Sequence, residues 1–256
     1  MAEATTAKEQ IFNLLRTTGV HRFPKWVVNF LPAPFQRLAI RLGAKAELVP
    51  TDELRLRYEE AIARLAKETP VLGDYVEFGV FQGTSMACMF EASNARGQPQ
   101  MRLLGFDSFE GLPSDAGNED GGVWEAGTFR SSIQYTRTYL RSKGVDMERV
   151  SLVKGWFCDT ATDATAEALD LKTASIVMVD CDMYSSAKDA LNFVGPRLAN
   201  PAVIFFDDWY SYDLADQNMG EKRALTEFLE ENPSFSVEEL SEYGECGKGF
   251  LIRRAV

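Results

Sequence analysis

The chain has 256 residues, 45% of them hydrophobic and 25% charged, and a formal net charge of -11. This length and composition suit one large α/β domain with a substantial core. The acidic balance argues against a nucleic-acid partner, because phosphate contacts need clustered Lys and Arg. No apolar run approaches the roughly 18 residues of a membrane span, and the first residues lack a signal-peptide pattern, so we expect a cytoplasmic protein.

Residues 1–70 differ in pattern from the rest and predict an N-terminal helical appendage to a main domain of residues 71–256. Apolar residues recur there at helical spacing but are interrupted by Pro24, Pro32 and Pro34. Residues 1–50 hold seven Lys or Arg against three Glu, a net charge of about +4. Such a segment could cover the substrate as a lid or contact a second subunit in a homo-oligomer. Binding of residues 23–41 to a membrane surface is disfavoured, because the prolines break any long amphipathic helix.

From about residue 74 onward, strand and helix patterns alternate, which predicts a doubly wound, Rossmann-like and mostly parallel α/β sheet. The expected strands are 75–80, 101–107, 150–155, 175–180 and 202–207. The expected helices are 83–96, 131–143, 163–169, 185–198 and 221–230. Residues 235–240 and 249–254 predict a closing antiparallel pair, so the sheet should contain one antiparallel strand near the C-terminus.

The turn after the first expected strand, EFGVFQGTS (77–85), has glycines at Gly79 and Gly83. Glycine lets the backbone approach a ligand closely, and the following helix points its free N–H groups into the turn. The second expected strand ends at Asp107, where a carboxylate can accept hydrogen bonds from ribose hydroxyls. Together these features indicate a nucleoside-containing cofactor. The turn lacks the third glycine of an NAD site, so S-adenosylmethionine suits it better; the alternative is a purely structural turn.

Two further apolar runs, SIVMVD (175–180) and AVIFFDD (202–208), end in Asp180 and in the pair Asp207 and Asp208. Because ligands bind at the carboxyl ends of parallel strands, these acids should meet at one edge of the sheet. Each of them could instead cap the helix that follows its strand. Three carboxylates together favour a cation or substrate site, and oxygen ligands are those that Mg2+ prefers.

Six motifs follow one another in the chain: GDYVEFGVFQGTS (73–85), GFDSFEGLP (105–113), GGVWEAGTF (121–129), VKGWFCDT (153–160), VDCDMYSSAKDAL (179–191) and IFFDDW (204–209). In this order they resemble the macrocin O-methyltransferase family, whose members are class I S-adenosylmethionine-dependent enzymes acting on sugar hydroxyls of natural products. The resemblance covers roughly residues 71–230.

The resemblance implies that S-adenosylmethionine, Mg2+ and a small hydroxyl-bearing acceptor share one site. The residues expected at the cofactor are Glu77, Phe78, Gly79, Gly83, Thr84, Ser85, Asp107, Ser108, Gly155, Phe157 and Asp159. The residues implied for the metal are Asp180, Asp207 and Asp208, with Asp182 as an alternative to Asp180. The residues expected beside the acceptor are Asp182, Tyr184, Trp209 and Tyr210.

The sequence offers no obvious catalytic base. Its single histidine, His21, lies in the basic N-terminal segment, and catechol O-methyltransferases place a lysine where this chain has Met183. Lys188 lies further along the same stretch. Our hypothesis is that Asp180 accepts the proton or passes it to solvent.

Residues 112–129 are rich in Gly and acids, which is typical of a solvated loop. Because this stretch follows the strand that ends at Asp107, we expect it to fold over cofactor and substrate. Trp124 and Phe129 would be its apolar anchors.

The residues alone leave other functions open. A phenolic or catechol hydroxyl would suit the same chemistry as a sugar hydroxyl. Asp180-Cys181-Asp182 is also the DxD pattern of a metal-dependent glycosyltransferase, which leaves Asp207 and Asp208 without a role. A non-catalytic cofactor-binding module is disfavoured, because acids packed together are costly without a cation.

Overall fold

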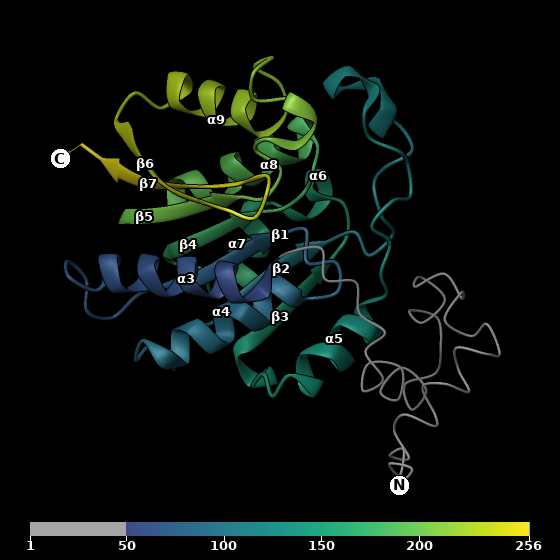
Figure 1. The fold of residues 1–256 in the computed structure, drawn as a ribbon. Helices are drawn as coiled ribbons and strands as arrows, with labels where there is room; N and C mark the ends of the chain where they lie inside the picture. Colours follow the sequence, from purple (N-terminus) through teal and green to yellow (C-terminus); the bar gives the residue numbers. More distant parts are fainter. Residues whose placement is uncertain (1–49, 256) are drawn as a thin grey trace, which may run out of the picture.

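The computed structural model describes residues 50–255, which form a seven-stranded sheet with helices on both faces (Figure 1). The strand order is β3-β2-β1-β4-β5-β7-β6, in which β1 to β5 are parallel and β7 is antiparallel to both of its neighbours. The strands are β1 (Asp74–Phe78), β2 (Leu103–Asp107), β3 (Val150–Lys154), β4 (Ala174–Val179), β5 (Leu198–Phe206), β6 (Phe235–Tyr243) and β7 (Gly247–Arg254). The predicted doubly wound sheet with an antiparallel strand near the C-terminus is confirmed.

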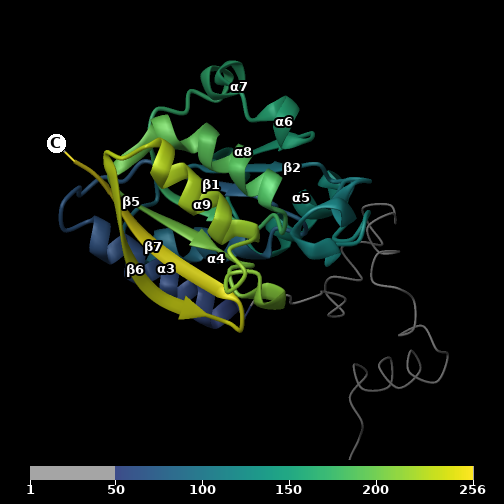
Figure 2. The same ribbon diagram turned by 90° about the horizontal axis from the view of Figure 1, so that it is seen from above.

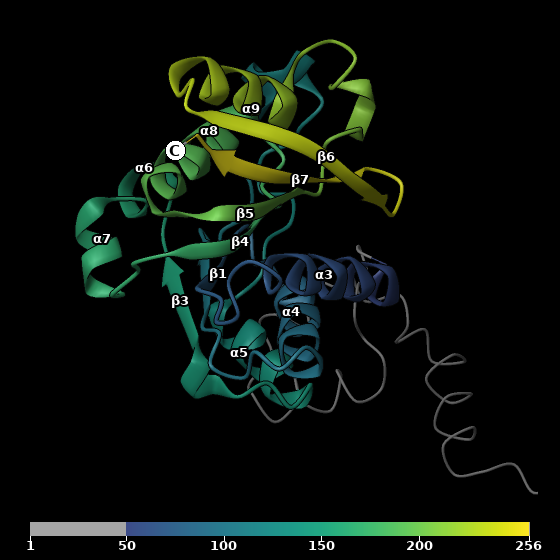
Figure 3. The ribbon, with the colours of Figure 1, turned by 90° about the vertical axis from the view of Figure 1, so that its left-hand side faces the viewer.

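The helices form two layers, one on each face of the sheet. They are α3 (Thr51–Leu65), α4 (Thr84–Ala95), α5 (Ile133–Ser142), α6 (Phe157–Thr160), α7 (Asp163–Ala168), α8 (Tyr184–Val194) and α9 (Gly220–Glu231). Figures 1 and 3 show α3, α4 and α5 on one face and α6 to α9 on the other, and Figure 2 shows α8 and α9 side by side. Each layer of helices packs on one face of the sheet and encloses an apolar core there. Because both faces are covered, β1, β2 and β4 are buried along their whole length.

Helix α3 is the described part of the predicted N-terminal appendage, and it packs directly on the sheet. Its buried residues Leu54, Tyr58, Ile62 and Leu65 recur at helical spacing and belong to the same core as α4 and β1. The acids in its first turn favour the helix, because negative charge is stabilised at a helix N-terminus. The rest of the predicted appendage, residues 1–49 with His21, lies outside the described residues.

The sheet topology brings the loops with the predicted site residues together. The chain runs outward from β1 through β2 to β3 and returns to β4, so the strand order reverses between β1 and β4. Phe78 of β1 pairs with Val179 of β4, which pairs with Phe206 of β5, so the three strands end at the same level. Ligands bind at such a reversal, just beyond the carboxyl ends of the strands.

Several element boundaries differ from the sequence prediction for local reasons. β1 ends at Phe78 instead of residue 80, because Gly79 turns the chain with a φ of +91°. α8 ends at Val194 instead of residue 198, because a short 3-10 turn (Gly195–Arg197) containing a proline follows it. The short helix α6 was not expected. Between residues 50 and 255, no helix is long and apolar enough to cross a membrane.

Candidate functional site

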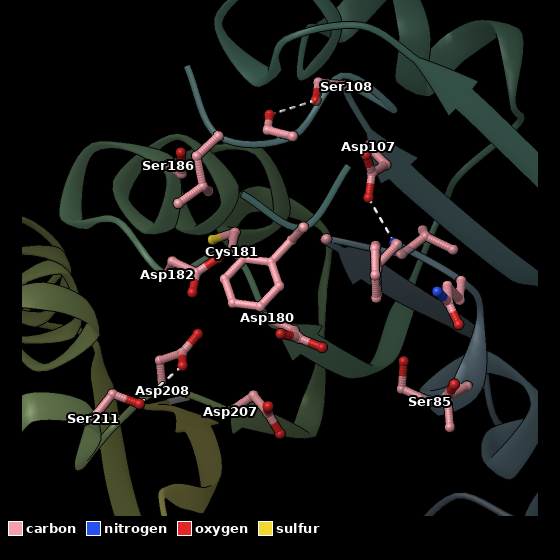
Figure 4. Close-up of a pocket in the computed structure, with 18 of the residues that line it drawn as sticks. Ser85, Asp107, Ser108, Asp180, Cys181, Asp182, Ser186, Asp207, Asp208 and Ser211 are labelled. Atoms are coloured by element: carbon pink, nitrogen blue, oxygen red, sulfur yellow. Dashed lines mark hydrogen bonds between the residues drawn. The ribbon is translucent and has the colours of Figure 1, made fainter. Parts of the chain in front are cut away.

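A cavity of about 720 Å³ opens at the carboxyl ends of the parallel strands. Its wall is formed by the segments that follow β1, β2, β3, β4 and β5, together with the turn between β6 and β7 and Pro50. Figure 4 shows Asp107 and Ser108 on one side of this pocket and the four acids Asp180, Asp182, Asp207 and Asp208 on the other. The pocket therefore has a side formed by β1 and β2 and a side formed by β4 and β5.

The turn after β1 is shaped by close packing against β4. A Cβ on Gly79 would lie 1.6 Å from the Asp180 carbonyl oxygen, so only glycine fits there. Gly83, with a φ of +89°, precedes α4 and packs on Leu140. Gly79, Thr84 and Ser85 line the pocket. The turn thus exposes backbone and small side chains to whatever occupies the cavity.

Glu77 and Phe78 lie behind the pocket wall and do not line it. Glu77 is fully buried and accepts hydrogen bonds from the hydroxyls of Ser85 and Tyr75, the latter at 3.0 Å. Burial raises the pKa of Glu77 to about 8. Phe78 stacks on Phe106 in the core at a ring-centroid distance of 5.1 Å. Glu77 therefore acts on the pocket through Ser85, whose hydroxyl it holds.

Asp107, at the end of β2, connects the turn after β1 to the loop after β2. Its carboxylate accepts the backbone N–H of Phe81 at 2.7 Å and that of Phe109 at 2.5 Å. Burial raises its pKa, and these two hydrogen bonds partly offset the rise. A carboxylate has further acceptor positions, so Asp107 can still accept hydrogen bonds from a ligand in the pocket. Ser108, which donates to the Gly111 carbonyl oxygen at 3.0 Å, lines the pocket beside it.

The segment after β3 completes the same side of the pocket. Gly155, Trp156 and Phe157 line the cavity, whereas Asp159 is exposed and does not line it. Trp156 lies inside the stretch 155–159 that the resemblance implies beside the adenine, although it was not named individually among the expected cofactor residues. An aromatic residue in this position offers a flat apolar surface.

Four aspartates form the opposite side, directly after β4 and β5. The Asp180 N–H donates to the Phe78 carbonyl oxygen at 2.9 Å, and the Asp207 N–H donates to Val179 at 3.0 Å, so the backbone places both acids at the strand ends. The Asp208 carboxylate accepts the Ser211 hydroxyl at 2.9 Å. The four aspartates named in the sequence prediction for metal and acceptor all line the pocket.

On this side of the pocket, buried carboxylates lie close enough to repel one another when they are ionised. Burial raises the pKa of Asp180, Asp182 and Asp208, and the charges of the neighbouring aspartates raise the first two further. The pKa of Asp207 rises to about 7, through burial and the charge of Asp208. Removal from water and nearby like charges both disfavour the ionised form. The cluster is therefore stabilised by protons or by a cation.

Glu221 is a fifth carboxylate of this group and was missed by the sequence prediction. It lies in the first turn of α9, is 2% exposed, and its Oε2 accepts the Asp208 N–H at 3.0 Å. Its Oε1 is buried without a hydrogen-bond partner, and burial together with the charge of Asp208 raises its pKa. An acid near a helix N-terminus is a common sequence pattern, so nothing in GEKRAL marks this glutamate as different.

The donor chemistry of the cluster fits a hard cation, because all of these side chains offer carboxylate oxygens. In residues 50–255, however, no group of three or more Asp, Glu, His or Cys side chains is already arranged to hold a metal ion. The unpartnered Glu221 oxygen and the mutually raised pKa values are the observations that favour a cation. The residues therefore fit Mg2+ by chemistry, and a formed metal site is not seen.

The pocket lining that the structure describes contains no Lys, Arg or His. Lys188 lies outside the pocket and pairs with Glu227 at 2.7 Å. The groups of this lining that can accept a proton are carboxylates, two cysteines and Tyr243. Burial raises the pKa of Tyr243 and of Cys181 well above the usual values, which disfavours their ionised forms.

Three aromatic residues expected beside the acceptor do not line this pocket. The Tyr184 hydroxyl donates to Glu227 at 2.6 Å between α8 and α9. Trp209 packs on Phe250 in the core at 4.6 Å between ring centroids, and the Tyr210 hydroxyl donates to Glu242 at 2.8 Å. The pocket wall in this region is formed instead by Pro50 and by the turn of Tyr243, Gly244, Glu245, Cys246 and Gly247. These residues are distant in sequence from the motifs, so no local pattern could reveal them.

The segment 112–128 between β2 and α5 is a closed loop beside the pocket. Its base is joined by two backbone hydrogen bonds, from the Leu112 N–H to Thr128 at 2.9 Å and from the Gly127 N–H to Leu112 at 2.8 Å. Trp124 is buried against Tyr212, with 5.3 Å between the rings, which confirms it as an apolar anchor. Phe129 packs on Phe81 and lines the pocket.

Comparison with known proteins supplies a family for this chain. The family model of Macrocin-O-methyltransferase (TylF) matches residues 51–233. A relative from Streptomyces olivaceus, 8-demethyl-8-(2,3-dimethoxy-alpha-L-rhamnosyl)-tetracenomycin-C 4'-O-methyltransferase, is 31% identical over 145 residues, which are 54% of each chain. Demethyldecarbamoylnovobiocin O-methyltransferase from Streptomyces niveus is 28% identical over 169 residues, 63% of this chain and 62% of the relative. The chain thus spans about half of the first relative and about three fifths of the second.

Solved structures of O-methyltransferases share the fold. The O-methyltransferase NovP superposes with a TM-score of 0.62 at 21% identity and covers 80% of both chains. The calicheamicin methyltransferase CalS11 superposes with a TM-score of 0.61 at 20% identity, over 97% of this chain and 94% of the other. The order of the sheet, the pocket at its carboxyl edge and the family match agree with the six motifs in the sequence. The chain belongs to the macrocin O-methyltransferase family.

Proposed function

We propose that this protein transfers the methyl group of S-adenosylmethionine to a hydroxyl of a small natural-product acceptor, with Mg2+ bound at the aspartate cluster. The observation that carries the proposal is the arrangement of the pocket. Asp107, a carboxylate placed to accept hydrogen bonds from ribose hydroxyls, faces the aspartates after β4 and β5. The family match supports methyl transfer to oxygen. A DxD glycosyltransferase finds no support in these comparisons.

The side formed by β1, β2 and β3 would hold the cofactor. Gly79, Thr84 and Ser85 provide close backbone approach for the methionine end, and Asp107 provides acceptors for the ribose hydroxyls. Trp156 and Phe157 line the neighbouring wall and would contact the adenine ring. Because aromatic and adenine rings are both flat and apolar on their faces, this contact favours one orientation of the cofactor.

The side formed by β4 and β5 would hold the cation and the acceptor. Asp180, Asp207 and Asp208 are the ligands we assign, and Asp182 and Glu221 add negative charge behind them. When bound, Mg2+ acts as a Lewis acid and makes a hydroxyl easier to deprotonate. The aspartates orient the acceptor oxygen toward the sulfonium methyl, and such orientation of reactants lowers a barrier by up to about 7–11 kcal/mol.

The transfer step follows from these positions. The acceptor oxygen forms a bond to the methyl carbon while the bond from that carbon to sulfur breaks, which yields a methyl ether and S-adenosylhomocysteine. The hydroxyl proton passes to Asp180, which lies between the β1 turn and Asp207, and then to solvent. Burial and the neighbouring charges raise the pKa of Asp180 in the absence of a cation, and a bound cation would oppose that rise and keep the carboxylate in the ionised form that can accept a proton.

We assign the acceptor to sugar hydroxyls of natural products. The tetracenomycin relative is named for the 4'-hydroxyl of a rhamnosyl group, and CalS11 is described as a TDP-rhamnose 3'-O-methyltransferase. Their names support this class for the present chain through the shared family.

Calorimetry and methyl-transfer assays test the proposal. We expect S-adenosylhomocysteine to bind, and methyl-labelled cofactor to label a rhamnosylated acceptor in the presence of Mg2+ and at least ten times more slowly with EDTA. Absence of S-adenosylhomocysteine binding would contradict the cofactor assignment. Full activity in EDTA would contradict the role of Mg2+ and leave methyl transfer intact.

A further inference from the structure

Asp120 is buried in a part of the chain that its composition marks as solvated. It lies in the loop 112–128, in the stretch NEDGG, yet it is only 7% exposed. Burial of a carboxylate is costly unless hydrogen bonds replace its water. The position of Asp120 therefore depends on the partners that the fold supplies.

Those partners are the first residues of two helices. The Gly220 N–H at the start of α9 donates to Asp120 Oδ1 at 2.9 Å, and the Tyr184 N–H at the start of α8 donates to Oδ2 at 2.8 Å. The residues that precede the two helices, Met183 and Met219, provide no side-chain cap. The first N–H groups of a helix have no partner within the helix, and negative charge is favoured at that end. One carboxylate thus caps both helices at once.

Both helix starts are adjacent to the acids of the pocket. Tyr184 follows Asp182 by two residues, and Gly220 immediately precedes Glu221. Glu221 in turn accepts the Asp208 N–H at 3.0 Å, and Asp182 and Asp208 lie on the same side of the pocket. Asp120 therefore links the helix that follows the acids after β4 to the helix that contacts the acids after β5.

The surrounding loop reinforces the contact to α8. Glu119 accepts the Ser185 N–H at 2.9 Å and the Ser185 hydroxyl at 2.8 Å. Trp124 packs in a small apolar cluster with Met183, which immediately precedes α8, and with Leu214. Met219, which immediately precedes α9, packs against this cluster. The same loop begins after the cofactor-side residues Ser108 and Gly111. It is thus joined covalently to the cofactor side, and its hydrogen bonds and apolar contacts connect it to the other side.

We propose that Asp120 is a positioning residue, which holds the starts of α8 and α9 so that Asp182 and Asp208 keep the spacing needed for methyl transfer. The catalytic part of this inference rests on the function proposed above. The structural part, the double cap, does not.

The test uses the full chain with four variants, two at Asp120 and two controls. Asp120→Ala removes both acceptors, and Asp120→Asn keeps one acceptor and places an N–H group against the other donor. Asp115→Asn removes a charge from an exposed residue of the same loop and is the local control. Asp74→Ala is the stability control, because it breaks the contacts to Arg102 at 2.5 and 2.8 Å at the far end of β1.

Hydrogen exchange and kinetics are measured on each variant. We expect Asp120→Ala to lose protection at the amides of Tyr184 and Gly220 and to lower kcat at least about tenfold, with the affinity for S-adenosylhomocysteine changed less than about threefold. Asp120→Asn should lie between Asp120→Ala and the wild type. Asp115→Asn should resemble the wild type in both measurements, and Asp74→Ala should lower Tm while keeping kcat.

Two outcomes would overturn the inference. One is a kcat of Asp120→Ala within twofold of the wild type; the other is an equal loss of kcat in Asp74→Ala at an equal loss of Tm. If the wild type transfers no methyl group to any acceptor, the proposed function fails instead. In that case unchanged protection of the two amides in Asp120→Ala would overturn the double cap by itself, and lost protection would support it.

Discussion

The two sides of the pocket satisfy their acids in opposite ways. On the cofactor side, Glu77 accepts hydrogen bonds from the hydroxyls of Tyr75 and Ser85, and Asp107 accepts them from two backbone N–H groups. On the acceptor side, the charges of Asp207 and Asp208 raise the pKa of Asp180, and Asp208 likewise raises that of Asp207. The difference teaches that hydrogen bonds from the chain hold the acids of the first side in place, whereas repulsion between the acids of the second side is relieved by protons or a cation.

The largest expected effect comes from neutralising the acceptor side. Asp180→Asn or Asp208→Asn should lower kcat by about 10³ at saturating Mg2+, because each removes a charged oxygen from the place where the acceptor is held. Without divalent ions, the same variants should raise Tm at pH 8, because they remove repulsion between buried charges. Steady-state kinetics and thermal unfolding check the two effects. If either variant kept near wild-type turnover, the assigned role of that aspartate in the reaction would be wrong.

A substitution at Gly79 tests the preorganisation of the cofactor side. Gly79→Ala places a Cβ 1.6 Å from the Asp180 carbonyl oxygen and should weaken S-adenosylhomocysteine binding by about 10² in calorimetry. Gly97→Ala is the matched control, because Gly97 also has a positive φ, of +71°, but a Cβ there meets nothing within 4 Å. The control should lower stability by about 1 kcal/mol, through backbone strain alone, and leave binding unchanged. Equal binding by the two variants would contradict the close packing at Gly79.

The raised pKa values predict how stability without divalent ions depends on pH. Burial raises the pKa of Glu77 to about 8, and burial with the charge of Asp208 raises that of Asp207 to about 7. A group whose pKa is raised on folding stabilises the fold while protonated, so this stability is complete below about pH 4 and is lost as pH rises toward 7–8. Each unit of pKa difference corresponds to about 1.4 kcal/mol.

Denaturant unfolding between pH 5 and 9 measures this dependence. Glu77→Gln should flatten the upper part of the curve, near pH 8, because glutamine resembles the protonated acid. Mg2+ should flatten the part near pH 7 instead, because a cation stabilises the ionised aspartates of the other side. If Mg2+ left the curve unchanged, the cation site would lose its support.

The smallest expected effect is at Tyr243, which lines the pocket and whose pKa is raised by burial and by the charges of Asp207 and its other neighbours. Tyr243→Phe should lower kcat/KM for the acceptor about three- to tenfold and leave S-adenosylhomocysteine affinity unchanged. Tyr210→Phe is the control, because that hydroxyl donates to Glu242 outside the pocket. Equal effects from both substitutions would show that Tyr243 has no particular role on the acceptor side.

Local patterns predicted much of the fold and part of the site. The apolar runs ending in Asp107, Asp180 and Asp207 located the parallel strands to within a few residues, because buried strands need continuous apolar sequence. The same pattern placed the acids at one edge of the sheet. It could not place Tyr184 or Trp209, because an aromatic side chain near a motif packs equally well in a core or in a pocket.

The sequence by itself determined the order of strands and helices, the glycine turn after β1 and the acids at the strand ends, because each depends on residues close together in the chain. Only the tertiary structure decided which distant residues complete the site. Glu221 reaches Asp208 from α9, Asp120 joins α8 to α9, and Tyr243 closes the wall from the β6–β7 turn. These contacts depend on how layers pack, and a carboxylate or a tyrosine has the same local sequence signal whether it faces solvent or a buried partner.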